Sequence, residues 1–239
     1  MGAGSDDIII DAEALSLSYT VRRSGLFRSL KIPALRDVSF KVMRGETLGI
    51  VGPNGSGKST LLKVLAGIFR PDSGRIVTTA NSISLMTLNL GIDPLLSGRD
   101  NAIFGGMLLG FSYRAVAARL EEIKQFSGLG EKFDQPMKSY SSGMSARLKF
   151  SVAINLSPDV MLLDEALAVG DRAFRARAYG AITSKIESDQ TVILVSHSEN
   201  EIAKLCDRVL LLDAGKILCE GLTEPVLEQY SQLMAEKSE

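Results

Sequence analysis

The sequence contains one histidine, two cysteines and no tryptophan among its 239 residues. A single histidine argues against a histidine-based zinc site. The cysteines, Cys206 and Cys219, stand in apolar surroundings and lack the spacing of metal ligands, so we expect structural thiols in a reducing compartment. These absences exclude a disulfide framework and the common zinc folds.

The chain also lacks a long apolar run and an excess of charge. No apolar stretch reaches the roughly 18 residues that a membrane span needs, and no cationic region followed by an apolar run opens the sequence. The formal net charge of −1 gives no broad attraction to nucleic acid or to an anionic membrane. We therefore expect no nucleic-acid partner, no membrane span and no export of the chain itself, and any role at a membrane would need a partner.

The most informative stretch that is present is a glycine-rich loop between a strand pattern and a helix pattern. It follows the apolar segment 47–51 and leads into a stretch with apolar residues at helical spacing. This context is what a phosphate-binding P-loop requires, because the loop amides and the helix N-terminus then face one anion. The alternative, a glycine-rich turn that matches by accident, has a chance of roughly one in a hundred from average residue usage. The loop consists of Gly52, Pro53, Asn54, Gly55, Ser56, Gly57, Lys58, Ser59 and Thr60.

Two residues of this loop have specific expected roles. Lys58 is expected to reach the β- and γ-phosphates of a nucleotide, and the Ser59 hydroxyl is expected to bind Mg²⁺.

Two later strand patterns end in residues that suit the same chemistry. An apolar run ends in Asp164 and Glu165, where Asp164 would hold Mg²⁺ and Glu165 would activate a water. Alone, such a pair is a common polar turn after a strand, but beside a P-loop this is the weaker interpretation. The single histidine, His197, follows another apolar strand and is expected to contact the γ-phosphate.

The pattern of apolar residues predicts an α/β fold. Continuous apolar runs at 160–163, 192–195 and 209–212 indicate a parallel sheet covered on both faces. Between Ser97 and Leu156 the sequence reads mainly as helix. We expect one helix there from an N-cap at Ser112 to a stop at Gly128, and a last helix with Thr223 as its cap.

Two further segments are less specific. The turn before a helix at Ser141, Ser142 and Gly143 is a weak signal for an anion site, since many helices begin with small residues. The basic stretch 22–31 fits either a short exposed amphipathic helix or a loop. Its functional interpretation is contact with a membrane subunit or its lipid-linked substrate, and the alternative is a solvated loop.

Together these motifs resemble the ATPase subunit of an ABC transporter along nearly the whole chain. The loop at 52–60 matches Walker A, 162–165 matches Walker B, and His197 matches the switch histidine. The resemblance also places Asp171 in the D-loop and Tyr19 against adenine. Residues 140–144, Tyr-Ser-Ser-Gly-Met, occupy the signature position that is usually Leu-Ser-Gly-Gly-Gln, and keep its first serine and second glycine.

The resemblance implies a P-loop NTPase core of RecA-like type. This core has a mostly parallel sheet, an N-terminal antiparallel β portion and a helical subdomain. It further implies one nucleotide-binding domain over 1–239, with the helical subdomain at 97–157 and a helical tail at 220–239.

Departures from the family pattern point to one branch. The altered signature, the stretch 89–101 and the basic insertion resemble exporters of lipid-linked polysaccharides, namely O-antigens, capsules and teichoic acids. The usual glutamine is absent between Ser82 and Asn101, and either Asn89 or Asp93 would stand in for it.

That branch implies a function and a set of partners. The chain would form a homodimer that binds ATP and Mg²⁺ and would drive a membrane permease from the cytoplasmic face of the plasma membrane. Each ATP would lie between the P-loop of one copy and Ser141–Gly143 of the other. The alternative is the ATPase subunit of a small-solute ABC transporter.

Overall fold

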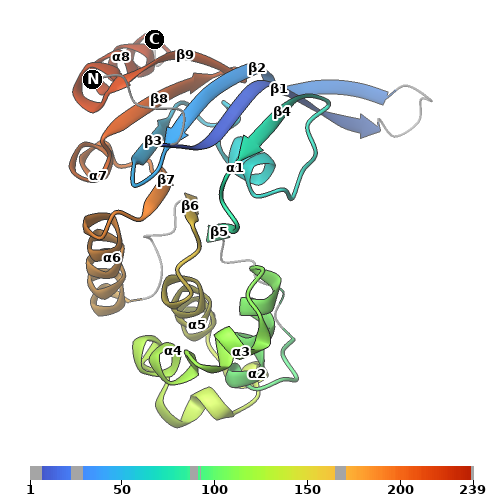
Figure 1. The fold of residues 1–239 in the computed structure, drawn as a ribbon, viewed down its shortest axis with the longest axis vertical. Helices are drawn as coiled ribbons and strands as arrows, with labels where there is room; N and C mark the ends of the chain where they lie inside the picture. Colours follow the sequence, from blue (N-terminus) through green and yellow to red (C-terminus); the bar gives the residue numbers. More distant parts are fainter. Residues whose placement is uncertain (1–6, 23–28, 87–90, 92, 165–170, 238–239) are drawn as a thin grey trace.

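The computed structural model describes residues 7–22, 29–86, 91, 93–164 and 171–237. Two sheets and their helices form the upper part of the molecule in Figure 1, and a group of helices lies below them. The expected α/β fold with an antiparallel β portion and a helical region is confirmed.

The larger sheet has six strands in the order β5-β6-β7-β3-β8-β9. The first five strands of this order are parallel, and β9 joins the edge antiparallel to β8. Every residue of β3 and β7 is buried, as expected for strands covered on both faces. The strands are β3 (Thr47–Val51), β5 (Ile83–Met86), β6 (Val160–Asp164), β7 (Thr191–Val195), β8 (Arg208–Asp213) and β9 (Lys216–Leu222).

The smaller sheet is antiparallel, with the order β2-β1-β4. It comprises β1 (Ile8–Arg22), β2 (Ser29–Met43) and β4 (Ser73–Thr78). The long β1–β2 hairpin extends away from the body of the molecule in Figure 1. Ser29–Lys31 of the basic stretch belong to strand β2, so a helix over that whole stretch is wrong, because these residues pair with β1. Residues 23–28 lie outside the described part of the chain.

Two hydrophobic clusters cover the two faces of the parallel sheet. One face packs against the antiparallel sheet and α1 (Lys58–Leu65). The other packs against α6 (Arg172–Glu187), α7 (Glu199–Leu205) and α8 (Thr223–Glu236). Alternate residues of the five parallel strands enter opposite clusters; in β7, Ile193 belongs to the first and Val192 to the second. The sheet is therefore fixed from both sides, and its strand ends form a rigid edge.

The helices below the sheets share a third hydrophobic cluster. They are α2 (Gly98–Leu108), α3 (Tyr113–Ala117), α4 (Leu120–Ser127) and α5 (Ser142–Asn155), with 3₁₀ turns at Gly130–Asp134 and Met137–Ser139. Helix α5 contributes to this cluster through Leu148 and to the core through Phe150. It therefore packs into both regions, as does α4 through Ile123 and Phe126.

Two sequence predictions about helix ends need correction. The single helix from Ser112 to Gly128 is two helices, although Ser112 caps the first and Gly128 ends the second. The break follows from a 3₁₀-type bond, in which the Arg119 amide donates to the Val116 carbonyl at 2.9 Å. Thr223 is not a cap but the first residue of α8, because its hydroxyl donates to the Cys206 carbonyl at 2.7 Å.

No helix in the described residues is long and apolar enough to cross a bilayer.

Candidate functional site

Three neighbouring strands of the parallel sheet bring the predicted site residues to one edge. Strands β6, β7 and β3 are adjacent and parallel, and Val195 of β7 is level with Asp164 on one side and with Ile50 on the other. The glycine-rich loop begins two residues after Ile50, and His197 lies two residues after Val195. The carboxyl ends of parallel strands are where α/β sheets bind ligands. The topology therefore gathers the loop, Asp164 and His197.

The loop needs glycine at two positions for steric reasons. Gly52 has φ 153°, and a Cβ there would lie 1.9 Å from the Leu212 carbonyl oxygen. Gly57 has φ 111°, and a Cβ there would lie 2.5 Å from the Ala34 carbonyl oxygen. Both glycines therefore let the loop pack directly on neighbouring backbone, which fixes its curvature.

The Lys58 side chain is buried inside this curve. Its ammonium donates to the carbonyls of Gly52 at 2.7 Å and Pro53 at 2.9 Å. The ammonium is thus held by the backbone of the loop itself, where its charge attracts an anion.

Two further observations show that this loop fits a phosphate group. The Ser56 hydroxyl is buried and has no hydrogen-bond partner in the described structure, which is costly unless a ligand or water satisfies it. Helix α1 begins at Lys58 without a side-chain cap, so its first amides face the loop. An orphaned hydroxyl, an ammonium and uncapped helix amides are all hydrogen-bond donors, as bound phosphate requires.

Oxygen ligands for a cation stand beside the loop. Ser59 is exposed in the first turn of α1, and Asp164 is half-buried at the end of β6. Such oxygens suit Mg²⁺, which keeps several waters and binds substrate phosphates. The described residues contain no group of three or more His, Cys, Asp or Glu that could hold a metal by itself. Glu165 lies outside the described residues.

Tyr19 approaches the same loop from the antiparallel sheet. Its hydroxyl and that of Thr60 form a hydrogen bond of 3.0 Å, and its ring meets the Phe69 ring edge-on at 6.1 Å. The Tyr19 side chain is still 40% exposed. A fixed, exposed aromatic ring next to a phosphate-binding loop is well placed to stack on a nucleobase.

His197 stands in a turn that its neighbours stabilise. It is exposed, while the Ser196 hydroxyl donates to the Glu201 carboxylate at 2.6 Å and accepts from the Ser198 amide at 3.0 Å. These bonds connect the end of β7 to the first turn of α7 and fix the direction of the histidine backbone.

The residues at the signature position lie in the helical region. Ser141 caps α5 by accepting a hydrogen bond from the Met144 amide at 3.2 Å. Ser142 and Gly143 form the first turn of that helix. This placement differs from that of the loop, Asp164 and His197, because Met144 and Leu148 of α5 pack in the third cluster, while those three lie at or just after the ends of parallel strands. The helix end is open to solvent at both serines.

Asp171 connects this helix with the core. It caps α6 by accepting from the Phe174 amide at 2.9 Å, and this bond, followed by the Arg147 charge, lowers the pKa of its carboxyl. The Arg147 guanidinium of α5 lies 3.8 Å from the Asp171 carboxylate. Asp171 therefore links the start of α6 to the signature helix.

The structure also shows a buried side-chain amide, that of Asn101, which the sequence analysis did not identify as a candidate for a structural or functional role. Asn101 of α2 is 5% exposed, and its side chain donates to the carbonyls of Asp93, Leu96 and Ser97 and accepts from the Asp93 amide at 2.9 Å. A polar residue in the interior of a predicted helix was the only signal for it. The Asp93 carboxylate accepts from the Leu95 amide at 2.9 Å, so it is engaged in this turn. Asn89, the other proposed substitute for the missing glutamine, lies outside the described residues.

Comparison with known proteins agrees with this geometry. Over 235 residues the chain is 38% identical to the O-antigen export system ATP-binding protein RfbB of Klebsiella pneumoniae, covering 98% of this chain and 92% of that protein. Over 201 residues it is 47% identical to the ABC transporter protein AbcA of Aeromonas salmonicida, covering 84% of this chain and 65% of that protein. It is also 38% identical over 203 residues to the teichoic acids export ATP-binding protein TagH of Enterococcus faecalis, covering 84% of this chain and 45% of that protein.

Solved structures support the fold. The dimeric ATP-binding cassette MJ0796 in a post-hydrolysis state with ADP and phosphate superposes with a TM-score of 0.73 at 21% identity, covering 90% of this chain and 99% of that chain. An ATP-binding subunit of an ABC transporter superposes with a TM-score of 0.78 at 20% identity, covering 97% of this chain and 100% of that chain.

The family of ABC transporters matches residues 35–168, which is more than half of the chain and includes the glycine-rich loop, the signature position and Asp164. The resemblance to ATP-binding subunits of polysaccharide exporters is likewise confirmed by these relatives. From the strand-edge geometry, the fold and the matched residues together, the chain belongs to the ABC transporter family as an ATP-binding subunit.

Proposed function

We propose that this chain hydrolyses ATP to drive the export of a lipid-linked polysaccharide through a membrane permease. The observation that carries the proposal is the meeting of the phosphate-binding loop, Asp164 and His197 at one sheet edge. The polymer class comes from the relatives, whose names describe O-antigen and teichoic acid export. A small-solute transporter is not favoured by these relatives.

In this proposal each residue at the sheet edge has its own role in binding or hydrolysing ATP. Lys58, the loop amides and the Ser56 hydroxyl bind the phosphates, while Tyr19 stacks on adenine. Ser59 and Asp164 would hold Mg²⁺, which neutralises phosphate charge when bound. Glu165 orients and deprotonates the attacking water, and His197 donates a hydrogen bond to the terminal phosphate.

The second half of each site would come from a second copy. The open side of the loop needs a cover that excludes water and adds donors, because electrostatic stabilisation is stronger in a dry site. The exposed N-terminus of α5, with Ser141, Ser142 and Gly143, supplies such donors. We infer a head-to-tail homodimer in which ATP closes the pair and hydrolysis releases it, at the cytoplasmic face of the plasma membrane where the permease would hold it.

The substitution Glu165→Gln tests this proposal directly. The variant keeps a side chain of the same shape but has no base, so it should bind ATP, stall hydrolysis and accumulate a dimer. Light scattering with and without Mg-ATP, alongside phosphate release, measures both effects. A variant that turns over ATP normally would remove Glu165 from its role, and a chain that binds no ATP would overturn the proposed function.

The cargo needs a separate experiment. The membrane protein that copurifies with this chain should be identified, and the surface polymer should be analysed in cells that lack the chain. Loss of a surface polysaccharide with accumulation of its lipid-linked form inside the cell is expected. An unchanged surface polymer, together with loss of uptake of a small solute, would support the small-solute alternative.

A further inference from the structure

The segment that enters the helical region is bound to the segment that leads to the signature helix. We call residues 93–98 the entry segment and residues 132–140 the approach segment. The Met137 amide donates to the Leu96 carbonyl at 2.9 Å and the Lys138 amide to the Pro94 carbonyl at 2.8 Å. The Gly98 amide of the entry segment donates to the Gln135 carbonyl at 3.2 Å. The two segments are therefore one backbone-bonded unit.

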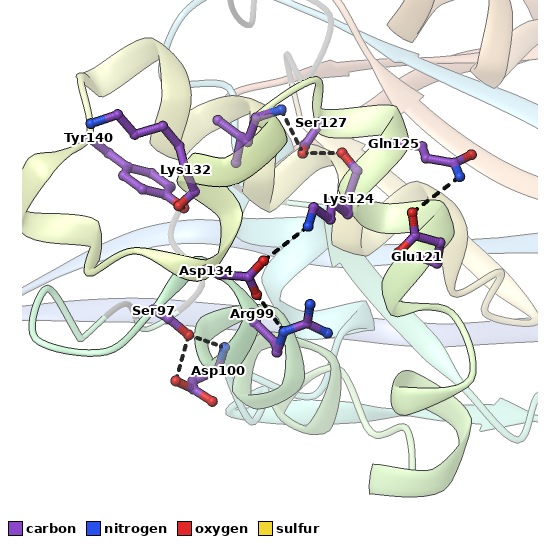
Figure 2. A network of polar contacts seen from close by, with 11 residues as sticks. Ser97, Arg99, Asp100, Glu121, Lys124, Gln125, Ser127, Lys132, Asp134 and Tyr140 are labelled. Carbon is purple, nitrogen blue, oxygen red and sulfur yellow. Dashed lines mark hydrogen bonds and ion pairs between the residues drawn. The ribbon is translucent and has the colours of Figure 1, made fainter.

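Side-chain hydrogen bonds stabilise both the entry segment and the approach segment of this unit. Asn101 binds the backbone of the entry segment, as described above. In the approach segment, the Asp134 carboxylate accepts from Arg99 at 2.6 Å and from Lys124 at 3.0 Å. Figure 2 shows these contacts converging between α2, α4 and the approach segment. The approach segment thus has a fixed position relative to α2 and α4.

Tyr140 forms the last contact before the signature helix. Its hydroxyl donates to the Lys132 carbonyl at 2.6 Å, and Figure 2 shows the ring lying beside Lys132. A Cβ on Gly98 would lie 2.2 Å from the Tyr140 hydroxyl oxygen and 2.8 Å from the Phe133 carbonyl oxygen, so the phenol packs directly on the first turn of α2. Burial, and secondarily the Asp134 charge, raises the pKa of the phenol, which keeps it protonated as a donor.

Ser141 follows Tyr140 directly in the chain. Both residues have extended backbone, with Tyr140 at φ −86°, ψ 145° and Ser141 at φ −71°, ψ 162°. An anchored ring at Tyr140 therefore determines where the Ser141 hydroxyl and the first turn of α5 point. A leucine, the usual residue at this position in the family, would fill space there but could not donate to the Lys132 carbonyl.

We propose that Tyr140 is a positioning residue that acts through Ser141. It holds the cap of α5 in the orientation that reaches the ATP bound to a second copy of the chain. The inference rests on the proposed function, because it assigns Tyr140 to the half of the site that the second copy supplies. It also explains how this chain keeps Ser141 while its signature departs from the usual sequence.

The test compares three chains in the Glu165→Gln background: Tyr140 unchanged, Tyr140→Phe and Tyr140→Leu. The midpoint ATP concentration for dimer formation is measured by light scattering, and ATP binding to the monomer is measured separately at low protein concentration. Tyr140→Phe loses only the hydroxyl bond and should raise the midpoint by about threefold to tenfold. Tyr140→Leu should raise it further, while monomer binding stays within about twofold, because the phosphate loop is untouched.

A double-mutant cycle with Ser141→Ala separates positioning from a general effect on stability. If Tyr140 acts through Ser141, adding Tyr140→Phe to Ser141→Ala should raise the midpoint by less than about twofold. Equal effects of Tyr140→Phe with and without Ser141 would overturn the inference. The matched control is Tyr113→Phe, which removes the hydroxyl of an exposed tyrosine of α3 and should leave the midpoint unchanged.

Failure of the inference differs from failure of the proposed function. If the chain with Tyr140 unchanged forms no dimer with ATP, the proposed function falls and this inference falls with it. If that chain and Tyr140→Leu form the dimer at the same ATP concentration, only the inference is overturned. Thermal melting of each variant confirms that the compared chains are folded.

Discussion

The sheet edge and the N-terminus of α5 are held by different forces. At the edge, β3 is buried throughout, Lys58 is 7% exposed, and Gly52 packs on backbone. At α5, Ser141 and Ser142 are exposed, and the approach segment is held by backbone bonds to the entry segment and by side-chain bonds such as that of Tyr140.

This difference bears on which motif can vary. At Gly52 and Gly57 the loop packs on neighbouring backbone and leaves no room for a larger residue, so the residue at each of these positions is narrowly determined. An exposed helix end that is held in part by hydrogen bonds of about 1 kcal/mol each can accept new residues if another bond replaces the lost one. The glycine-rich loop of this chain accordingly fits the family pattern, while its signature keeps only the first serine and the second glycine.

The largest expected effect comes from Lys58→Ala, which removes the buried cation of the edge. The loss of a preorganised charge at the phosphates should lower the ATP hydrolysis rate by roughly a hundredfold or more and weaken ATP binding. Isothermal titration and phosphate release measure both. Lys63→Ala is the matched control on the same helix, since its ammonium lies 5.6 Å from the centre of the Phe69 ring and not in the loop. Equal activity in both variants would contradict the role of Lys58.

Ser141→Ala tests whether the open helix end has a role beyond capping. Removal of the cap should cost about 1 kcal/mol of stability. Ser112→Ala is the matched control, because Ser112 caps α3 in the same region by accepting from the Ala115 amide. Only Ser141→Ala should reduce ATP-driven dimer formation, by about tenfold. A similar reduction in both variants would show that stability alone is responsible.

Tyr19 allows base recognition to be tested separately from phosphate binding, because its ring should contact the base and not the phosphates. Tyr19→Ala should weaken ATP binding by about tenfold, the loss of one base stack, and leave binding of inorganic triphosphate unchanged. Tyr19→Phe keeps the ring and loses only the bond to Thr60, so it should retain most of the ATP affinity. If Tyr19→Ala weakens triphosphate binding equally, the ring supports the loop and does not read the base.

The smallest expected effect is on thermal stability, and it concerns the exposed hydrogen bonds of Asp134 in the helical region. Hydrogen bonds from Arg99 and then Lys124 lower the pKa of Asp134 below its ordinary value of 3.8. A carboxyl with a lowered folded pKa stabilises the protein above its unfolded pKa, and this contribution is lost as the pH falls through the folded pKa. Asp134→Asn should therefore lower the melting temperature slightly at pH 7, and the difference should shrink below pH 3.8 and in high salt. Glu131→Gln, at an exposed residue of the same turn, is the matched control.

The edge of the sheet was predictable from the sequence because its signals are local. The spacing of glycines around Lys58 and the apolar run before Asp164 already specify a strand followed by a phosphate loop and a strand that ends in a carboxylate. The helix cap at Ser112 was predicted in the same way, because a cap bonds within its own turn, whereas the caps at Ser141 and Asp171 were not predicted as caps. The break between α3 and α4 could not be predicted, since the bond from the Arg119 amide to the Val116 carbonyl tightens the backbone there without a glycine or proline to mark it.

The sequence by itself therefore determined the P-loop, the α/β pattern and the family resemblance, since each depends on patterns among residues that are close in the sequence. Only the tertiary structure decided that Asp164, Val195 and Ile50 are level with one another, that Asn101 binds the entry segment, and that Tyr140 packs on Gly98. The reason is physical. Strand order and contacts between distant segments depend on the packing of the whole core, and residues 42 positions apart, such as Gly98 and Tyr140, carry no local pattern that joins them.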